Sequence, residues 1–294
     1  MSSLPAKETG IAAEIRNGQT EIADGGGKSV SPEYAAYLRK QRGKLWAIRA
    51  GRLLVLAVFL ALWELAAAVG WVNPMLTSKP SSLVRSFYEL ALGGQLMHHT
   101  WVTSKETMIG MAISMLLGTL ISIVFWWSSY TSKVLEPYIV VLNALPKVAL
   151  GPIFYIWLGD RNSVYGMAIA ISIIVTIIMI ENGFREISRT KLKLMESFGA
   201  SRFQMLRMVL LPASIPNFIA TLKVNVGLTL VGVIMGEFLS SKAGLGYLII
   251  YGGQVFQMDL VMVSIMMLAL LSVVLYGIVS LGGYWAMRKY HLDH

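Results

Sequence analysis

Long, almost uniformly apolar stretches recur along the chain and are separated by polar segments. Because lipid offers backbone amides no partner, a helix that crosses a bilayer needs about 20 mostly apolar residues. Stretches of about this length cover 53–72, 107–127, 134–158, 164–180, 213–236 and 260–287. The pattern therefore predicts an all-α membrane protein with six transmembrane helices. The third stretch is the weakest, because Pro137, Pro146, Lys147 and Pro152 interrupt it.

The N-terminal region differs from the rest of the chain. Residues 1–30 are polar and rich in glycine, and we expect a disordered cytoplasmic tail there. Residues 31–52 have Pro32 near their start and mix aromatic and aliphatic residues with bases, which favours an amphipathic helix lying in the membrane interface. A solvated lead-in to the first span is the alternative. Residues 53–290 form the predicted six-span domain, which includes the polar loop 181–212.

Composition supports the membrane assignment. Apolar residues make up 55% of the chain, charged residues 14%, and the mean hydropathy is +0.63. Soluble proteins carry roughly 25% charged residues, so a soluble globular domain and a disordered chain are both excluded. Most of the Lys and Arg behind the net charge of +9 lie before residue 53 and in the loop after the fourth stretch. Cytoplasmic loops hold such an excess, so we expect both termini in the cytoplasm and no nucleic-acid partner.

Candidate chemistry is sparse. The chain has no cysteine, and the adjacent His98 and His99 would point about 100° apart on a helix, so we expect no metal site. The run ending in Gly27-Lys28-Ser29 resembles the end of a phosphate-binding loop, but the first glycine of that motif would fall on Ile22. We therefore expect no catalytic residues and no cofactor in this chain.

The loop between the fourth and fifth stretches has the pattern of short amphipathic helices. Gly199 stands where a helix would end or bend, and an apolar face follows before Leu211-Pro212. One interpretation is a knob on which another protein docks in the cytoplasm. The other is an interfacial loop that covers its own helix bundle.

At these residues the chain resembles the membrane subunits of binding-protein-dependent ABC importers, in the branch that handles nitrate, sulfonates and taurine. The family signature is an EAA box followed at fixed spacing by a glycine, an aliphatic residue and Leu-Pro. Its Glu-Ala-Ala positions are here Lys193, Leu194 and Met195, with an acid only at Glu196. The resemblance assigns contacts with the ATPase to Lys193, Glu196, Gly199, Ala200, Ser201, Val209, Leu211 and Pro212.

The resemblance covers about residues 45 to 290. In and just after the third stretch, the branch's pattern is matched by Asn143 to Pro152 and by Trp157-Leu158-Gly159. Around the end of the fifth stretch it is matched by Gly236-Glu237-Phe238 and Gly244-Leu245-Gly246. The fold implied is that of a type I ABC importer permease.

The family also implies function and partners. Two copies would form one pore in the bacterial inner membrane, surrounded by lipid, with the choice between identical and different copies left open. Two ATP-binding cassette subunits would hold the ATP and Mg, and an extracytoplasmic binding protein would deliver the solute. That solute would be an aliphatic sulfonate, taurine or nitrate, or else a vitamin precursor of the pyrimidine or flavin type. A membrane-embedded enzyme and a scaffold are the competing readings.

Ionisable residues inside the predicted spans are functional candidates, because each costs at least about 2.5 kcal/mol at mid-bilayer. We expect Lys147 and Lys223 to line the translocation pathway, with Asn143 and Asn225 as hydrogen-bonding neighbours. Alternatively, Glu64 neutralises Lys147, and Lys223 reaches the cytoplasmic face.

Glu237 ends the fifth stretch beside a glycine-rich loop at the predicted outer face. We expect it either to contact the binding protein or to be a capped, solvated carboxylate.

Overall fold

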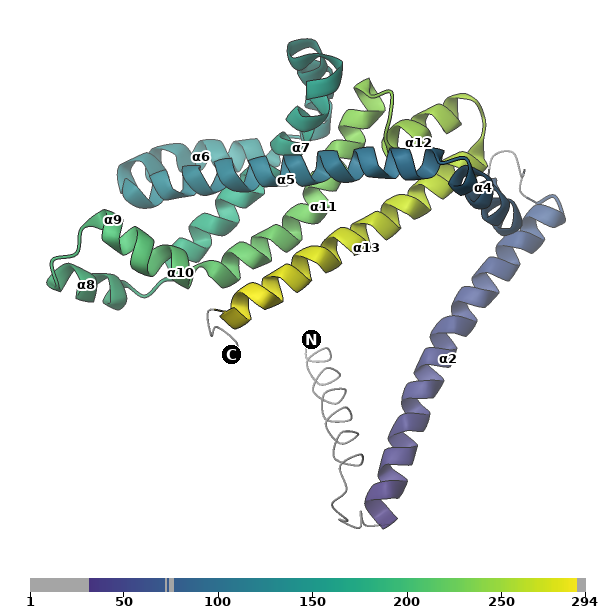
Figure 1. Ribbon diagram of the computed structural model, residues 1–294, viewed down its shortest axis with the longest axis horizontal. Coiled ribbons are helices and arrows are strands. Elements are labelled where there is room, and N and C mark those ends of the chain that lie inside the picture. Colours follow the sequence, from purple (N-terminus) through teal and green to yellow (C-terminus); the bar gives the residue numbers. More distant parts are fainter. Residues whose placement is uncertain (1–31, 72, 74–76, 290–294) are drawn as a thin grey trace. The chain divides into compact units, whose positions relative to one another are not determined.

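The computed structural model describes residues 32–71, 73 and 77–289, and the predicted tail 1–30 lies outside them. Every regular element in these ranges is a helix, so the all-α fold class is confirmed (Figure 1). The chain divides into two compact units, Met1–Leu62 and Trp63–His294.

In the first unit, the described residues form most of helix α2 (Pro32–Ala68). This helix runs through residue 52 without a break, so the predicted interfacial helix and the predicted first span are one continuous helix. Its part Trp46–Ala68 is long and apolar enough to cross a membrane. This candidate span begins before residue 53, the start of the first apolar stretch in the sequence.

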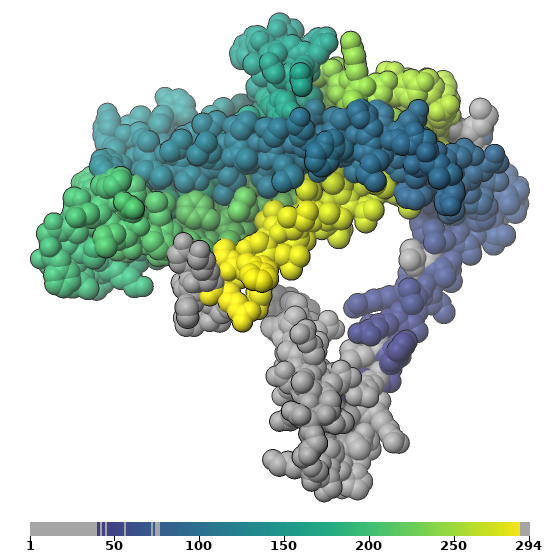
Figure 2. Space-filling view, viewed as in Figure 1, coloured from purple at the N-terminus to yellow at the C-terminus, as the bar shows by residue number. Residues whose placement is uncertain are grey.

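In the second unit the end of α2 is followed by α4 (Pro80–Leu92) and α5 (Gln95–Trp127). Gly94 in a left-handed conformation separates the two helices. The helix that carries the second predicted span therefore begins well before residue 107 and includes the two adjacent histidines. Figure 2 shows α5 as a continuous band of side chains across one face.

The third predicted span is divided into short pieces. Helix α6 (Ser129–Ala144) ends before Pro146, and the 3-10 helix η1 (Lys147–Leu150) leads into α7 (Gly151–Glu186). Within α7 the backbone leaves helical geometry at Gly159 (φ 74°, ψ 177°). Pro146 supplies no amide hydrogen and disfavours helical geometry in the residue before it, which accounts for the break after α6.

Beyond α7 come α8 (Arg189–Ser197), α9 (Arg202–Met205), the π-helix η2 (Leu206–Leu210) and α10 (Leu211–Ala213). The unit closes with α11 (Ile215–Ser240), α12 (Leu245–Gln254) and α13 (Met258–Lys289). In this unit, α8 and α9 lie at one end, and α4 and α12 lie at the other (Figure 1).

Five helical stretches within the described residues are long and apolar enough to cross a membrane: Trp46–Ala68, Gln95–Trp127, Lys147–Glu186, Ile215–Ser240 and Met258–Arg288. The count of six spans and the cytoplasmic location of the termini stay predictions.

Helices α5, α7 and α11 pack through small residues. A Cβ atom added to Gly232 of α11 would lie 2.6 Å from the Cα of Ala168 on α7, so the two backbones are in direct contact. The hydroxyls of Ser114 and Ser172 lie 2.6 Å apart between α5 and α7. Small residues of this kind let membrane helices approach closely, which favours packing where no hydrophobic effect acts between them. These three helices form the core that positions the loops at both ends.

Candidate functional site

The candidate docking site is built on α8 and α9, and its first feature is a sharp turn at Gly199. The amide of Ala200 donates to the carbonyl of Met195 (3.0 Å), and the amide of Gly199 donates to that of Glu196 (2.9 Å). With Gly199 at φ 75°, these two bonds form a Schellman C-cap. Gly199 therefore ends α8 as the sequence predicts.

Ser201 begins the next helix by a capping box with Gln204. The Gln204 amide donates to Oγ of Ser201 (3.3 Å), and the Ser201 amide donates to Oε1 of Gln204 (2.7 Å). The helix then widens into the π-helix η2, which the sequence did not predict. There the amide of Leu211 donates to the carbonyl of Leu206, next to Pro212, which has no amide hydrogen to donate.

The segment from α8 to η2 has a buried inner face and an exposed outer face. On the inner face Leu206 and Leu210 pack against Ile180 and Phe184 of α7. On the outer face four apolar side chains are exposed: Leu194, Phe198, Phe203 and Met208. Phe198 is 77% exposed and Phe203 is 60% exposed. We call these four residues the outer apolar face. Large exposed apolar groups gathered on one segment are typical of a protein–protein interface.

Arg202 ties this segment to the far end of α5. Its Nη1 donates to the backbone carbonyl of Trp127, the last residue of α5, at 2.8 Å. A cation at a helix C-terminus satisfies an unpaired carbonyl and opposes the negative end of the helix dipole. A side chain of the docking segment therefore contacts the junction between α5 and α6.

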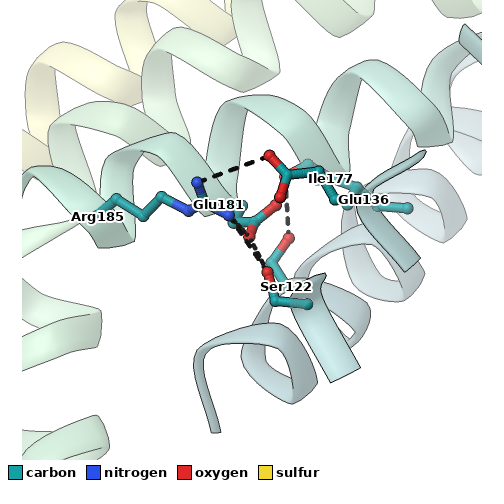
Figure 3. A network of polar contacts seen from close by, with 6 residues as sticks. Ser122, Glu136, Ile177, Glu181 and Arg185 are labelled. Carbon is teal, nitrogen blue, oxygen red and sulfur yellow. Dashed lines mark hydrogen bonds and ion pairs between the residues drawn. The ribbon is translucent and has the colours of Figure 1, made fainter. Parts of the chain in front are cut away.

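A polar network joins α6 to α7 near the same end (Figure 3). Arg185 donates to Oε1 of Glu181 at 2.7 Å and lies 4.0 Å from Oε1 of Glu136. Ser132 of α6 donates to the same Glu181 oxygen at 2.8 Å and accepts from Arg185. Ser122 of α5 donates to the carbonyl of Ile177 at 3.2 Å, so all three helices are joined by polar contacts at the base of the docking segment.

The predicted coupling residues differ in exposure. Lys193, Glu196, Gly199 and Ser201 are exposed, whereas Ala200, Val209, Leu211 and Pro212 are half-buried. The exposed group lies on α8 and in the turn after it, where Ala200 also lies. Val209, Leu211 and Pro212 lie further along, toward α11. An ATPase contact by the predicted residues stays a prediction, and the structure adds the outer apolar face beside them.

Of the predicted pathway residues, Asn143 and Lys147 lie close together. The Nζ of Lys147 donates to the backbone carbonyl of Asn143 at 3.1 Å, across the break after α6. Asn143 is exposed and Lys147 is half-buried. Glu64 accepts from the amide and hydroxyl of Ser81 at 3.0 and 2.8 Å, and its alternative pairing with Lys147 stays a prediction.

Asn225 lies in the core, apart from the exposed Asn143. It is 0% exposed, and its Nδ2 donates to Oγ1 of Thr176 at 2.7 Å and to Sδ of Met115 at 3.1 Å. Its Oδ1 finds no hydrogen-bond partner within the described part of the chain. In this conformation Asn225 joins α11 to α7, and its place in the translocation pathway stays a prediction. Lys223, two residues earlier, is half-buried.

Glu237 is buried, which neither expectation for it anticipated. The residue is 1% exposed. Its carboxylate accepts from Oγ1 of Thr103 at 2.7 Å and from the amide of Gly246 at 2.6 Å. A Cβ atom at Gly244 would lie 2.2 Å from Oε1 of Glu237, so the loop folds tightly over the carboxylate. We call this arrangement the Glu237 clasp. It leaves no surface of Glu237 for a direct contact with a binding protein in this conformation.

Two further bonds fix the same loop to α5. The amide of Gly244 donates to Nδ1 of His99 at 2.9 Å, and the amide of Leu245 donates to Oγ1 of Thr103 at 2.8 Å. The consecutive amides of Gly244 and Leu245, at the start of α12, thus donate to side chains of α5.

Comparison with known proteins identifies the fold described above. Residues 110–284, more than half of the chain, match the family described as the binding-protein-dependent transport system inner membrane component. The chain belongs to this family. It is therefore a multi-pass membrane protein and a permease subunit of an ABC importer.

Three relatives extend the match of this permease to most of its length. A probable ABC transporter permease of Haemophilus influenzae is 30% identical over 244 residues, covering 81% of this chain and 95% of the relative. The putative aliphatic sulfonates transport permease SsuC of Escherichia coli is 28% identical, covering 78% and 88%. The formylaminopyrimidine transport permease ThiX of Halalkalibacterium halodurans is 28% identical, covering 65% and 76%.

A solved structure agrees on the fold of the permease. The inward-facing methionine ABC transporter MetNI aligns with a TM-score of 0.57 at 17% identity, covering 68% of this chain and 98% of that chain. The type I importer permease fold expected from the sequence is confirmed.

Sequence reasoning missed the partners of Glu237 in this permease. Thr103 donates to Glu237, and His99 accepts from Gly244 of the loop that covers it. Both residues lie on α5, far from Glu237 in the sequence, and neither belongs to a recognised motif. The available signal was the pair Gly244 and Gly246, which marks a close approach of backbone to another group. The group approached could not be read from the chain.

Proposed function

We propose that this permease forms half of a translocation pore with a second copy of itself, and that an ATP-binding cassette subunit docks on α8 and α9. The outer apolar face carries this proposal. Phe198 and Phe203 are exposed on a segment whose inner face is already packed against α7. The basic loop around them belongs on the cytoplasmic side by the charge rule, where an ATPase would reach it.

The same segment can transmit motion into the membrane. Closure of two ATPase subunits would displace α8 and α9, and Arg202 would carry that displacement to the α5–α6 junction through its bond to Trp127. Leu206 and Leu210 would carry it to α7. The helices would then move as rigid bodies to open the pore alternately to either side. ATP and Mg would be bound by the partner subunit, and the binding protein would deliver solute at the other end.

The solute is a small organic or inorganic molecule such as an aliphatic sulfonate, taurine or nitrate, or a vitamin precursor. The similarity to a sulfonate permease and to a formylaminopyrimidine permease supports both kinds at equal identity.

The absence of cysteine from the chain makes a clean crosslinking test possible. Phe203→Cys places a single thiol on the outer apolar face, and Tyr88→Cys places an equally exposed thiol on α4 at the other end of the unit. A thiol-to-amine crosslinker applied to membranes should join the Phe203→Cys variant to an ATP-hydrolysing subunit. The Tyr88→Cys control should not form this product.

Two results would contradict the proposal. One is the same crosslinked product from both variants, and the other is maleimide labelling of Phe203→Cys from outside the cell. A full absence of any ATPase product from Phe203→Cys, with the protein folded and in the membrane, would also refute docking on this face.

A further inference from the structure

A cavity of about 1020 Å³ lies between α4, α12 and the N-terminal turns of α5 and α13. We call it the α4–α12 cavity. Its volume is at the upper end of the range for small-molecule sites, roughly 300–1,000 Å³. It lies at the end of the second unit opposite α8 and α9 (Figure 1). If the docking segment is cytoplasmic as proposed, this cavity is on the side where solute arrives.

One wall of the cavity is a row of three stacked rings. His99 and Tyr247 have ring centroids 5.9 Å apart with planes 26° from parallel, and Tyr247 and Tyr251 are 5.8 Å apart at 24°. All three residues line the cavity. Tyr251 ends the row and is 42% exposed. A flat ring entering the cavity could continue the row, because near-parallel offset stacking is a favourable arrangement of aromatic rings.

Phe256 lines the same cavity and is 66% exposed. Its φ of 57° belongs to the C-cap of α12, where the amide of Gln257 donates to the carbonyl of Gly252 at 2.8 Å and the amide of Phe256 to that of Gly253 at 3.4 Å. Phe256 therefore adds a fourth, exposed aromatic ring to the lining of the cavity.

The ring wall is rigidly placed by buried polar groups. The Glu237 clasp holds the amide of Gly246, and Thr103 and His99 hold the amides of Leu245 and Gly244. Tyr247 follows directly on these residues and Tyr251 lies one turn further along α12. These bonds therefore fix the backbone directly before the first tyrosine of the wall.

The polar lining includes hydrogen-bond donors beside the carboxylates of Glu89 and Asp259. Because Nδ1 of His99 accepts from Gly244, a neutral His99 carries its proton on Nε2 as a donor. Asp259 already accepts from Ser82 at 2.8 Å and from Ser78. Glu89 accepts from Arg85 at 2.9 Å, a bond that raises the pKa of the Arg85 guanidinium.

We propose that the α4–α12 cavity binds a planar heteroaromatic ring carrying hydrogen-bond acceptors, stacked on Tyr251. This inference rests on the proposed importer function and deepens it, since it selects the ring-containing class of solutes over compact sulfonates. Tyr247 and Tyr251 are then the residues that determine specificity, and Lys79 and Gln257 supply polar contacts at the edge of the cavity.

The test uses the full-length permease in nanodiscs and riboflavin as a fluorescent planar probe. Saturable quenching of riboflavin fluorescence should give a dissociation constant, and 4-aminopyrimidine should compete while taurine should not. Tyr251→Leu should weaken binding roughly fivefold or more, the size expected for one ring stacked on an aromatic side chain. Tyr251→Phe keeps the ring and should bind within about twofold of the unmodified chain.

Tyr284→Leu is the matched control, because Tyr284 is an exposed tyrosine near the other end of α13. It should bind riboflavin normally. No saturable binding, equal binding by Tyr251→Leu and Tyr284→Leu, or displacement of the probe by taurine would each overturn the inference. The Phe203→Cys crosslink is unaffected by these outcomes, so importer function could stand while the ring class fails.

Discussion

The direct backbone contact between α7 and α11 predicts a sharp difference between two glycines of one helix. In Gly232→Ala the new methyl group would lie 2.6 Å from the Cα of Ala168, 2.9 Å from the carbonyl oxygen of Met167 and 3.0 Å from the amide nitrogen of Ala168. These are backbone atoms of α7, which cannot turn aside as a flexible side chain could. In Gly227→Ala the methyl group meets nothing within 4 Å.

The expected difference follows because helix propensity cancels between the variants. Replacing glycine by alanine inside a helix gains about 0.8–1 kcal/mol at both positions. Forcing an extra methyl into a closely packed site costs typically about 1–3 kcal/mol, and only Gly232→Ala incurs this cost. We therefore expect Gly227→Ala to be as stable as the unmodified protein or slightly more stable. Gly232→Ala should be less stable than Gly227→Ala by about 1–3 kcal/mol.

Unfolding of the purified permease in mixed micelles, followed by circular dichroism as the fraction of denaturing detergent rises, measures this difference. Equal midpoints for the two variants would refute the direct backbone contact. A lower midpoint for Gly227→Ala than for Gly232→Ala would place the contact on the wrong face of α11.

Two further predictions concern the loops. In Glu237→Leu the Gly246 amide and the Thr103 hydroxyl lose their acceptor. A cysteine introduced at Ala243 should therefore react with maleimide severalfold faster in this variant than in the parent. Glu237→Gln keeps one acceptor oxygen, so its labelling rate should be intermediate. Equal labelling rates in all three backgrounds would show that the clasp does not hold the loop. Arg202→Met removes the donor to the Trp127 carbonyl. The ATPase should still dock on this variant, but solute uptake per ATP hydrolysed, measured in proteoliposomes, should fall severalfold. The exposed Arg207→Met is its control, and equal coupling in both variants would remove Arg202 from the transmission path.

The sequence predicts the helices and the docking turn well, because their signals are local. A run of apolar residues is enough to place α11, and Gly199 marks the end of α8 because a left-handed residue is needed there. The third span is less predictable. Pro146 marks the break after α6, but no strong local signal distinguishes Gly159 from other glycines in the chain.

Side-chain partners were the least predictable part. The sequence places Asn225 beside a pathway lysine, and Glu237 at the outer face, either against the binding protein or capped and solvated. Both residues are buried against residues from distant helices. The choice between a pathway residue and a core residue depends on which side of the helix meets α7 or α5. That side cannot be read from a helix that is apolar all round, because no polar stripe distinguishes one face.

The docking segment connects α7 directly to α11 in the chain, and those two helices touch backbone to backbone. Both ends of the segment are therefore attached to a single stiff body. If an ATPase pushes at Phe203 as proposed, we expect α7 and α11 to tilt or shift together, because their backbones are in contact.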